Sequence, residues 1–216
     1  MKTGLKVLLG AGAIALALFW WFSNPARAPK GRQGNPESVR PDDVQLVVQT
    51  VMPTITEFEK PEEADKWRSV DDVVMGGVSQ SVFSVTPEET GVFSGELSLE
   101  NNGGFASVRR NVEEVDFARV EAIALRVKGD GRPYQLRLQT ETANNSVSYR
   151  AEFETTADEW REVRLPLSDL EPVFRGRVVP DAPDLVASEI KQMGFLLADK
   201  QPGMFRLETD WIRTES

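Results

Sequence analysis

The sequence predicts an all-β fold, a β-sandwich, over residues 54–216. Apolar and polar residues alternate with period two in short segments, which is typical of antiparallel strands with one face on a core. Turn-forming residues separate these segments, and no long helical pattern lies between them. The alternating segments are 93–99, 123–127, 136–138, 147–153, 163–167, 194–197 and 204–212.

The predicted turns contain the residues that tight turns prefer. Asn and Gly tolerate left-handed backbone conformations, and Pro presets its own backbone angle. Such clusters lie at 101–104, 129–131, 144–145 and 201–203. Single helical turns are expected at 168–170 and 187–191.

The first 28 residues predict a membrane-anchor helix. Residues 7–22 form an uninterrupted apolar run that ends at a pair of tryptophans, Trp20 and Trp21. A helix of that length rises about 24 Å, slightly less than the hydrocarbon core of about 30 Å. Lys6 and the tryptophans suit the two interfaces and make up the difference.

A cleaved signal peptide is the alternative, because residues 26–28 have the small-x-small form of a cleavage site. Cleavage there would cut the bond between Ala28 and Pro29, a poor scissile geometry. We therefore expect a single-pass anchor in a bacterial inner membrane, with the folded domain on the periplasmic side. Residues 29–53 predict a linker, within which 44–52 are apolar enough for a short strand or docking segment.

Composition excludes several classes of site. The chain contains no Cys and no His. Disulfides, thiolate zinc sites, iron–sulfur clusters, thiol nucleophiles and the Ser-His-Asp triad are therefore excluded. An enzyme would have to use carboxylates, Lys, Tyr or an oxygen-ligated metal. We expect no catalytic residue, no cofactor and no metal.

The charge of the chain is unevenly distributed. The formal net charge is −9, yet residues 1–40 are basic, and the rest carries 33 acidic against 19 basic side chains. Phosphate backbones repel such an acidic body, so nucleic acid is not an expected partner.

Two segments carry a resemblance to a known family. Residues 67–79 read WRSVDDVVMGGVS, and residues 93–109 read FSGELSLENNGGFASVR. Both resemble the signature blocks of the NADH:ubiquinone oxidoreductase (complex I) intermediate-associated protein 30 family. The end of the chain, with Gly194-Phe195, Gly203-Met204-Phe205 and Trp211-Ile212, is similar to that family's closing strands. The resemblance spans residues 55–214.

This resemblance implies a galactose-binding-like jelly-roll sandwich. It also implies a non-enzymatic assembly factor, a chaperone-like module that binds protein subunits of respiratory complex I or a related membrane complex. The expected partners are those subunits, and the membrane through the N-terminal helix.

The two blocks supply the candidate binding residues for a client or ligand. They are Asp71, Asp72, Met75, Gly76, Gly77, Ser79, Asn101, Asn102, Gly103, Gly104, Phe105, Ser107 and Arg109. We expect both blocks at one end of the sandwich, as a polar binding surface. Structural explanations stay open: the glycines suit tight turns, Asp and Asn can satisfy their own loops, and Arg109 can pair with an acid. Met75 is expected to fill the core.

The alternative function is a carbohydrate-binding jelly-roll module of the cell envelope, with a glycan as ligand. Its binding face would be the charged outer face of one sheet. That face is predicted to carry Arg126, Arg137, Arg150, Glu141, Glu152 and Glu154. The exposed aromatic rings that stack on sugars are missing from this pattern, because Tyr134 and Tyr149 fall in phase with the apolar side.

Two further alternatives rest on carboxylates. A glycosidase would need two of them across a cleft, and Glu152 with Glu154 has that spacing, as i, i+2 acids do in any strand. Calcium would suit oxygen ligands where the first and last strands lie, at Glu57 or Glu59 with Glu208 or Asp210. We prefer solvated acids in both cases.

Overall fold

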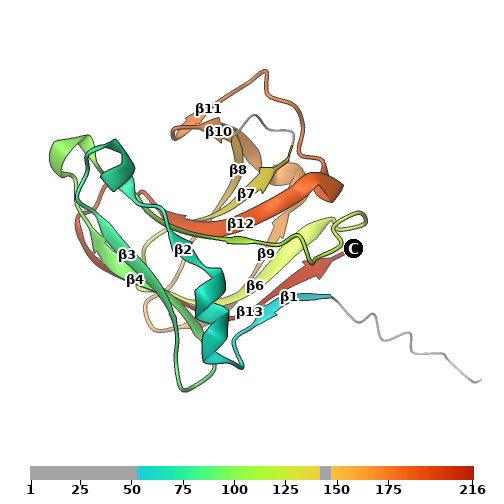
Figure 1. The fold of residues 1–216 in the computed structure, drawn as a ribbon, viewed down its shortest axis with the longest axis horizontal. Helices are drawn as coiled ribbons and strands as arrows, with labels where there is room; N and C mark the ends of the chain where they lie inside the picture. The colour runs from blue at the N-terminus through green and yellow to red at the C-terminus, as the bar shows by residue number, and fades with distance from the viewer. Residues whose placement is uncertain (1–52, 142–146) are drawn as a thin grey trace, which may run out of the picture. The chain divides into compact units, whose positions relative to one another are not determined.

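The computed structural model describes residues 53–141 and 147–216, which form two β-sheets packed face to face (Figure 1). The predicted all-β sandwich is confirmed. The predicted anchor over residues 1–28 and nearly all of the predicted linker lie outside the described residues, as do the turn at 144–145 and the apolar segment 44–52. Within the described ranges, no helix is both long and apolar enough to cross a membrane.

The six-stranded sheet has the order β3-β4-β13-β6-β9, with β1 also paired to β13, and all its pairs are antiparallel. The long last strand forms its centre, because it pairs with β4 along its first half and with β6 along its second. The bounds are β1 Thr54–Glu57, β3 Gln80–Val85, β4 Gly91–Leu97, β6 Ala122–Lys128, β9 Trp160–Pro166 and β13 Gly203–Glu215.

The seven-stranded sheet has the order β11-β10-β8-β7-β12-β5-β2 and is also antiparallel. Its bounds are β2 Arg68–Ser69, β5 Ala106–Asn111, β7 Tyr134–Thr140, β8 Ser148–Phe153, β10 Glu171–Phe174, β11 Arg177–Val178 and β12 Ile190–Leu197. The connections contain short 3-10 turns: η2 Pro61–Lys66, η3 Asp72–Met75, η4 Glu100–Asn102, η5 Leu167–Asp169 and η6 Ala187–Glu189. The last two are the helical turns that the sequence predicts.

The core lies between the sheets and is lined by the apolar phase of each strand. Trp67, just before β2, stacks on Phe83 of the opposite sheet, with ring centroids 4.2 Å apart, and on Phe195 at 5.7 Å. Tyr134 and Tyr149 are buried, as their phase in the sequence predicts. Aromatic pairs of this kind add packing energy beyond the area they bury.

Strand boundaries differ from the sequence prediction at one place that matters for the site. The alternation predicts a strand over 93–99, but β4 ends at Leu97, and Leu99 lies exposed in the following loop. Alternation alone does not mark a strand's end, because a loop residue can continue the pattern by chance. The predicted charged face is also divided: Arg126 lies on β6 of the six-stranded sheet, whereas Arg137 and Arg150 lie on β7 and β8.

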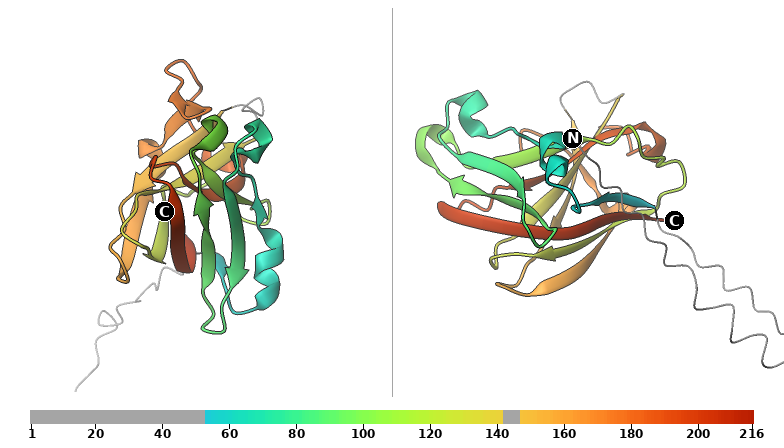
Figure 2. Two further views of the ribbon diagram at one scale, coloured as in Figure 1. Left: turned by 90° about the vertical axis from the view of Figure 1, so that its left-hand side faces the viewer. Right: turned by 60° about the horizontal axis from the view of Figure 1, so that its bottom comes forward.

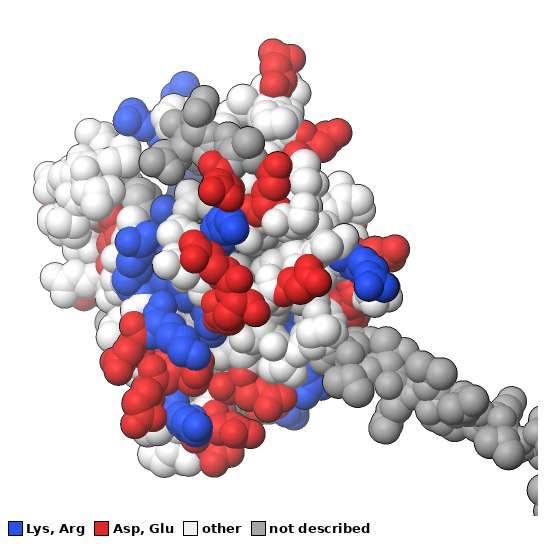
Figure 3. Space-filling view, turned by 45° about the vertical axis from the view of Figure 1, so that its right-hand side comes forward, with Lys and Arg blue, Asp and Glu red and all other residues white. Residues whose placement is uncertain are grey.

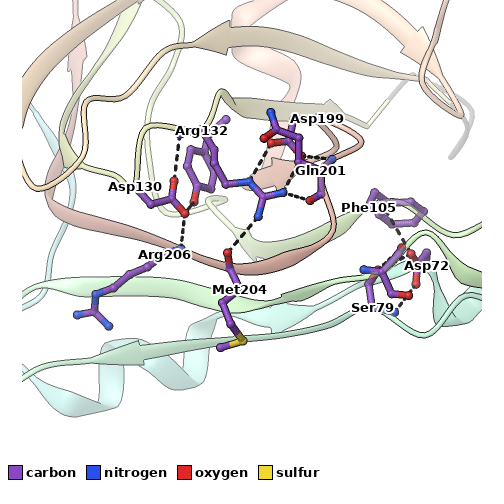
Figure 4. A network of polar contacts seen from close by, with 11 residues as sticks. Asp72, Ser79, Phe105, Asp130, Arg132, Asp199, Gln201, Met204 and Arg206 are labelled. Carbon is purple, nitrogen blue, oxygen red and sulfur yellow. Dashed lines mark hydrogen bonds and ion pairs between the residues drawn. The ribbon is translucent and has the colours of Figure 1, made fainter.

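Arg132 connects the turn between β6 and β7 to the turn between β12 and β13 through hydrogen bonds (Figure 4). Its guanidinium donates to both carboxylate oxygens of Asp199, at 2.8 and 2.7 Å, and to the carbonyls of Met204 and Gln201. Asp130 accepts from the backbone N–H of Arg206 at 2.9 Å. These polar contacts connect the two turns at one end of the sandwich.

Candidate functional site

The two blocks singled out by the sequence meet at one end of the sandwich. The loop from β2 to β3 contains η3, and the loop from β4 to β5 contains η4. Both lie side by side in every view (Figures 1 and 2). The backbone N–H of Asp72 donates to the carbonyl of Phe105, which joins the two loops directly.

Asp72 is the centre of this junction, and it is almost fully buried. Its carboxylate accepts the Ser79 backbone N–H at 2.9 Å and the Ser79 hydroxyl at 2.6 Å. It also accepts the backbone N–H of Gly104 at 2.7 Å and of Phe105 at 3.3 Å (Figure 4). Four donors from two loops therefore meet on one side chain.

Asp71 makes a parallel connection between the two sheets. Its carboxylate accepts the backbone N–H of Ser81 on β3 at 2.8 Å, the Ser81 hydroxyl at 2.6 Å and the backbone N–H of Ser107 on β5 at 2.9 Å. The Ser107 hydroxyl in turn donates to the carbonyl of Val70. We call the pair Asp71 and Asp72 with these donors the aspartate clasp.

Two of the glycines exist in this sequence because the clasp leaves no room for a side chain. A Cβ placed on Gly77 would lie 2.4 Å from the Asp72 carboxyl carbon, and one on Gly103 would lie 2.6 Å from an Asp72 carboxylate oxygen. Both distances are shorter than any real contact. Gly76 has a different reason, a φ of +93°, which L side chains rarely adopt.

The hydrogen bonds of the clasp determine the charge state of Asp72. Burial raises its pKa, but the Ser79 hydroxyl and the backbone N–H groups of Gly104, Ser79 and Phe105 outweigh burial and lower the pKa below the usual Asp value. Asp72 is therefore ionised at neutral pH, and hydrogen bonding to the charged form is the reason. Since donors of the chain itself occupy both oxygens, the geometry gives Asp72 a structural task.

The surface that the clasp supports is apolar. Val73, Val74, Met75 and Val78 project from the β2–β3 loop, and Leu99 projects from the β4–β5 loop beside it. Val74 is 72% exposed and Met75 is 59% exposed. The expectation that Met75 fills the core is therefore wrong. We call these five residues the apolar tip.

The other predicted site residues divide between the clasp, the tip and the sheet. Ser79 and Ser107 are buried in the clasp, and Phe105 is half-buried beside it. Asn101 and Asn102 are exposed with positive φ, as tight turns require. Arg109 lies away from the loops, in mid-strand on β5, paired with Arg68 on one side and Gly194 on the other.

The sequence interpretation missed Val73, Val74, Val78 and Leu99. A signal was present: three consecutive apolar residues precede Gly-Gly in a segment without alternation, where neither a strand nor a core helix explains them. The acids considered for calcium do not gather. Glu208 pairs with Lys128 at 2.7 Å, and no group of three or more acids in the described ranges is placed to hold a metal.

A family model described as Complex I intermediate-associated protein 30 matches residues 56–209. The chain belongs to this family. The match begins in β1 and ends in β13, so the family domain and the sandwich coincide.

Curated relatives bear the same family name in animals. The chain is 27% identical to complex I intermediate-associated protein 30, mitochondrial, of Mus musculus, over 78% of this chain and 58% of that protein. It is 23% identical to the protein of that name in Drosophila melanogaster, over 74% of this chain and 62% of that protein. It therefore spans about three fifths of the length of these two relatives.

Solved structures show the same fold in carbohydrate-binding modules. The family 11 module of a cellulosomal cellulase of Clostridium thermocellum matches with a TM-score of 0.60 at 13% identity, over 76% of this chain and 95% of the module. The Clostridium thermocellum module in complex with a β-1,3-1,4-mixed-linked tetrasaccharide matches with a TM-score of 0.55 at 14% identity, over 69% and 88%. The complex I intermediate-associated protein 30 domain is thus an all-β sandwich similar to these modules.

Proposed function

We propose that this protein is a non-enzymatic assembly factor that binds protein subunits of a membrane complex of the complex I type, and that the apolar tip is its docking surface. Membership of the complex I intermediate-associated protein 30 family supports the class of function. The observation that supports this docking surface is the cluster of exposed apolar side chains in the tip, on loops that the aspartate clasp joins.

The tip has the properties of a preorganised contact. Its apolar side chains gain free energy when a partner removes them from water, at about 25 cal/mol per Å² of apolar area. The clasp beneath them keeps the loops in one conformation, so little entropy is lost on binding. Exposed apolar clusters on a folded domain commonly mark interaction sites.

The occupant we favour is an apolar surface of a client subunit. Subunits of a membrane complex expose apolar area until they are joined, and an uncharged tip matches such a surface without burying an unpaired charge. The predicted helix over residues 1–28 would hold the domain at the membrane where the complex is built. A bacterial inner membrane, with the domain on its periplasmic side, remains our prediction for the site of action.

The test is co-purification of the full-length chain from detergent-solubilised membranes, with complex I subunits quantified by mass spectrometry. We expect the wild-type chain to retain them and the double variant Val74→Ser with Met75→Ser to lose them. Central apolar contacts cost about 2 kcal/mol or more when removed, which is roughly thirtyfold in affinity. The melting temperature should stay within about 2 °C, because both side chains are exposed.

The matched control removes two other exposed apolar side chains, Val82 and Met204, which lie on β3 and β13. Val82→Ser with Met204→Ser should keep the subunits. Equal loss in both double variants, or full retention in the tip variant, would overturn the docking surface. Tip-dependent binding to lipid vesicles without subunits would assign the tip to the membrane. Binding of mixed-linked glucan oligosaccharides instead would favour the carbohydrate-binding alternative.

A further inference from the structure

The outer face of the seven-stranded sheet carries a row of four arginines. Arg68 on β2 pairs with Arg109 on β5, Arg109 pairs with Gly194 on β12, and Gly194 pairs with Arg137 on β7. Arg150 on β8 continues the row opposite Arg137. Residues directly opposite in an antiparallel sheet share a face, so all four side chains rise from the same side.

The two central arginines are held by neutral groups only. Arg109 donates to the Gln139 side-chain oxygen at 3.4 Å. Arg137 donates to the Gln135 oxygen at 3.1 and 2.8 Å and to the Ser148 hydroxyl at 2.9 Å. Within the described ranges, neither guanidinium is paired with a carboxylate, whereas Arg150 pairs with Glu171 at 2.9 Å. Basic and acidic side chains lie next to one another on the face that Figure 3 shows.

Gly194 opens a notch between them. A Cβ on Gly194 would lie 2.1 Å from the backbone carbonyl oxygen of Val108 and 3.2 Å from the Arg109 Cγ, so a side chain is excluded here. The Arg109 side chain reaches across β12 at this position to Gln139 on β7. A hollow of about 40 Å³ lies at this point, lined by Arg109, Arg137, Gln139, Ser148 and Gln192 among others. It has room for a small group, with polar donors on several sides.

The positive charges of Arg109 and Arg137 are destabilised in the notch. Burial, followed by the charge of Arg68, lowers the pKa of Arg109 below its usual value. Burial, followed by the charges of Arg150 and Arg109, lowers the pKa of Arg137 to about 10. Both groups stay protonated at neutral pH, so two like charges share a partly dry site.

We propose that Arg109 and Arg137 form a binding site for a phosphate group, in the notch above Gly194. Guanidinium forks match the oxygens of phosphate, and the amide of Gln192 and the hydroxyl of Ser148 lie in the same lining. A phosphate monoester carries nearly two negative charges at neutral pH, which balances two guanidiniums. A single carboxylate would balance only one.

The site is independent of the apolar tip and of the acidic charge of the whole chain. A long polyanion would meet the acidic body and be repelled, whereas a single phosphate group is influenced mainly by charges within a Debye length of about 8 Å. Of the acids on this face, Glu171 is paired with Arg150, and Glu152 accepts a hydrogen bond from Gln135. The ligand class is therefore a small phosphorylated molecule or one phosphate group presented by a larger one.

The test uses the full chain and inorganic phosphate as the probe, by calorimetry and by melting temperature at constant ionic strength set with chloride. We expect phosphate to bind and to raise the melting temperature. Arg109→Gln and Arg137→Gln should each weaken phosphate binding by about tenfold or more. The matched control Arg119→Gln removes the same charge from an exposed loop residue and should leave binding unchanged.

Two further probes settle the chemistry. Acetate at the same ionic strength should bind at least tenfold more weakly than phosphate, and a neutral mixed-linked tetrasaccharide should not compete with it. Acetate binding as tightly as phosphate, equal weakening in Arg119→Gln, or no binding beyond chloride would each overturn the proposal. If a Gln variant fails to fold, Arg137→Lys keeps the charge and loses the fork, and wild-type affinity in that variant would also overturn it.

Discussion

Asp72 and Arg109 are both charged, both removed in large part from water, and both taken from the same two sequence blocks, yet their surroundings are opposite. Asp72 accepts four hydrogen bonds from donors of its own chain. Arg109 donates one long hydrogen bond to a neutral amide, and its nearest charged neighbours are arginines. The charge of Asp72 is therefore compensated by hydrogen bonds within the fold, whereas the charge of Arg109 is not.

This contrast separates structure from recognition within one motif. Burying a charge is costly unless hydrogen bonds or an opposite charge compensate it. In the aspartate clasp the compensation is internal, so the carboxylates hold the loops that display the apolar tip. In the arginine row the compensation is incomplete, so binding of an external anion would stabilise the guanidinium charges.

The largest effect we predict is on the clasp. Asp72→Ala leaves the backbone N–H groups of Ser79 and Gly104 without acceptors, each at a cost of about 1–3 kcal/mol. We expect a total loss of about 3–5 kcal/mol in the free energy of unfolding, measured by urea denaturation. Asp181→Ala, at an exposed residue, should change it by less than about 0.5 kcal/mol. Equal stability of the two variants would mean that the clasp is not structural.

A smaller effect is predicted for the glycine that makes room for the clasp. Gly77→Ala places a methyl group 2.4 Å from the Asp72 carboxyl carbon, so the loop must shift. Overpacking of this kind costs about 1–3 kcal/mol. In the double variant with Asp72→Ala, the cost of the methyl group should be smaller, because the two contacts at 2.4 Å are gone and only the Cβ of residue 72, at 2.9 Å, remains. Additive costs in this double-mutant cycle would contradict the steric explanation.

The pH dependence of stability sharpens the same point. The folded pKa of Asp72 lies below its unfolded value, so its contribution is fully present above about pH 4 and is lost as pH falls through the folded pKa. Glu63, Asp199 and Glu208, whose pKa values are also lowered, act with the same sign. We expect the melting temperature to decrease as the pH is lowered below about 4, and to decrease less steeply in Asp72→Asn. An equal slope in that variant would remove Asp72 from the acid response.

The smallest effect is predicted for the arginine row. Arg109→Gln removes a like-charge contact and breaks no ion pair, so the free energy of unfolding should change by less than about 0.5 kcal/mol. Arg132→Gln breaks the two-pronged pair with the nearly buried Asp199 and should cost about 3 kcal/mol or more. Thermal denaturation of the two variants makes the comparison. A large loss in Arg109→Gln would show that this arginine serves the fold.

The sequence predicted the sandwich well because strand alternation is local. The alternations around Leu125, Leu136 and Tyr149 correspond to β6, β7 and β8, with the predicted faces inward. The short strands β10 and β11 were not predicted, because two to four residues carry too little pattern to stand out. The blocks around Asp72 and Gly103 were correctly expected at one end of the sandwich.

The sequence by itself determined the fold class, the absence of Cys and His chemistry, the acidic body and the residues worth attention, because each of these depends on composition or on near neighbours in the chain. Only the tertiary structure decided which of those polar side chains find hydrogen-bond or ion-pair partners. Two of the four donors to Asp72 come from a loop more than twenty residues away in the chain. Whether Arg109 lies near an acid or near Arg137 depends on which strands adjoin β12. Strand order and loop contacts join residues that are far apart in the chain. They therefore decided that the aspartates are hydrogen-bonded in the clasp and that the charges of Arg109 and Arg137 have no acidic partner within the described residues.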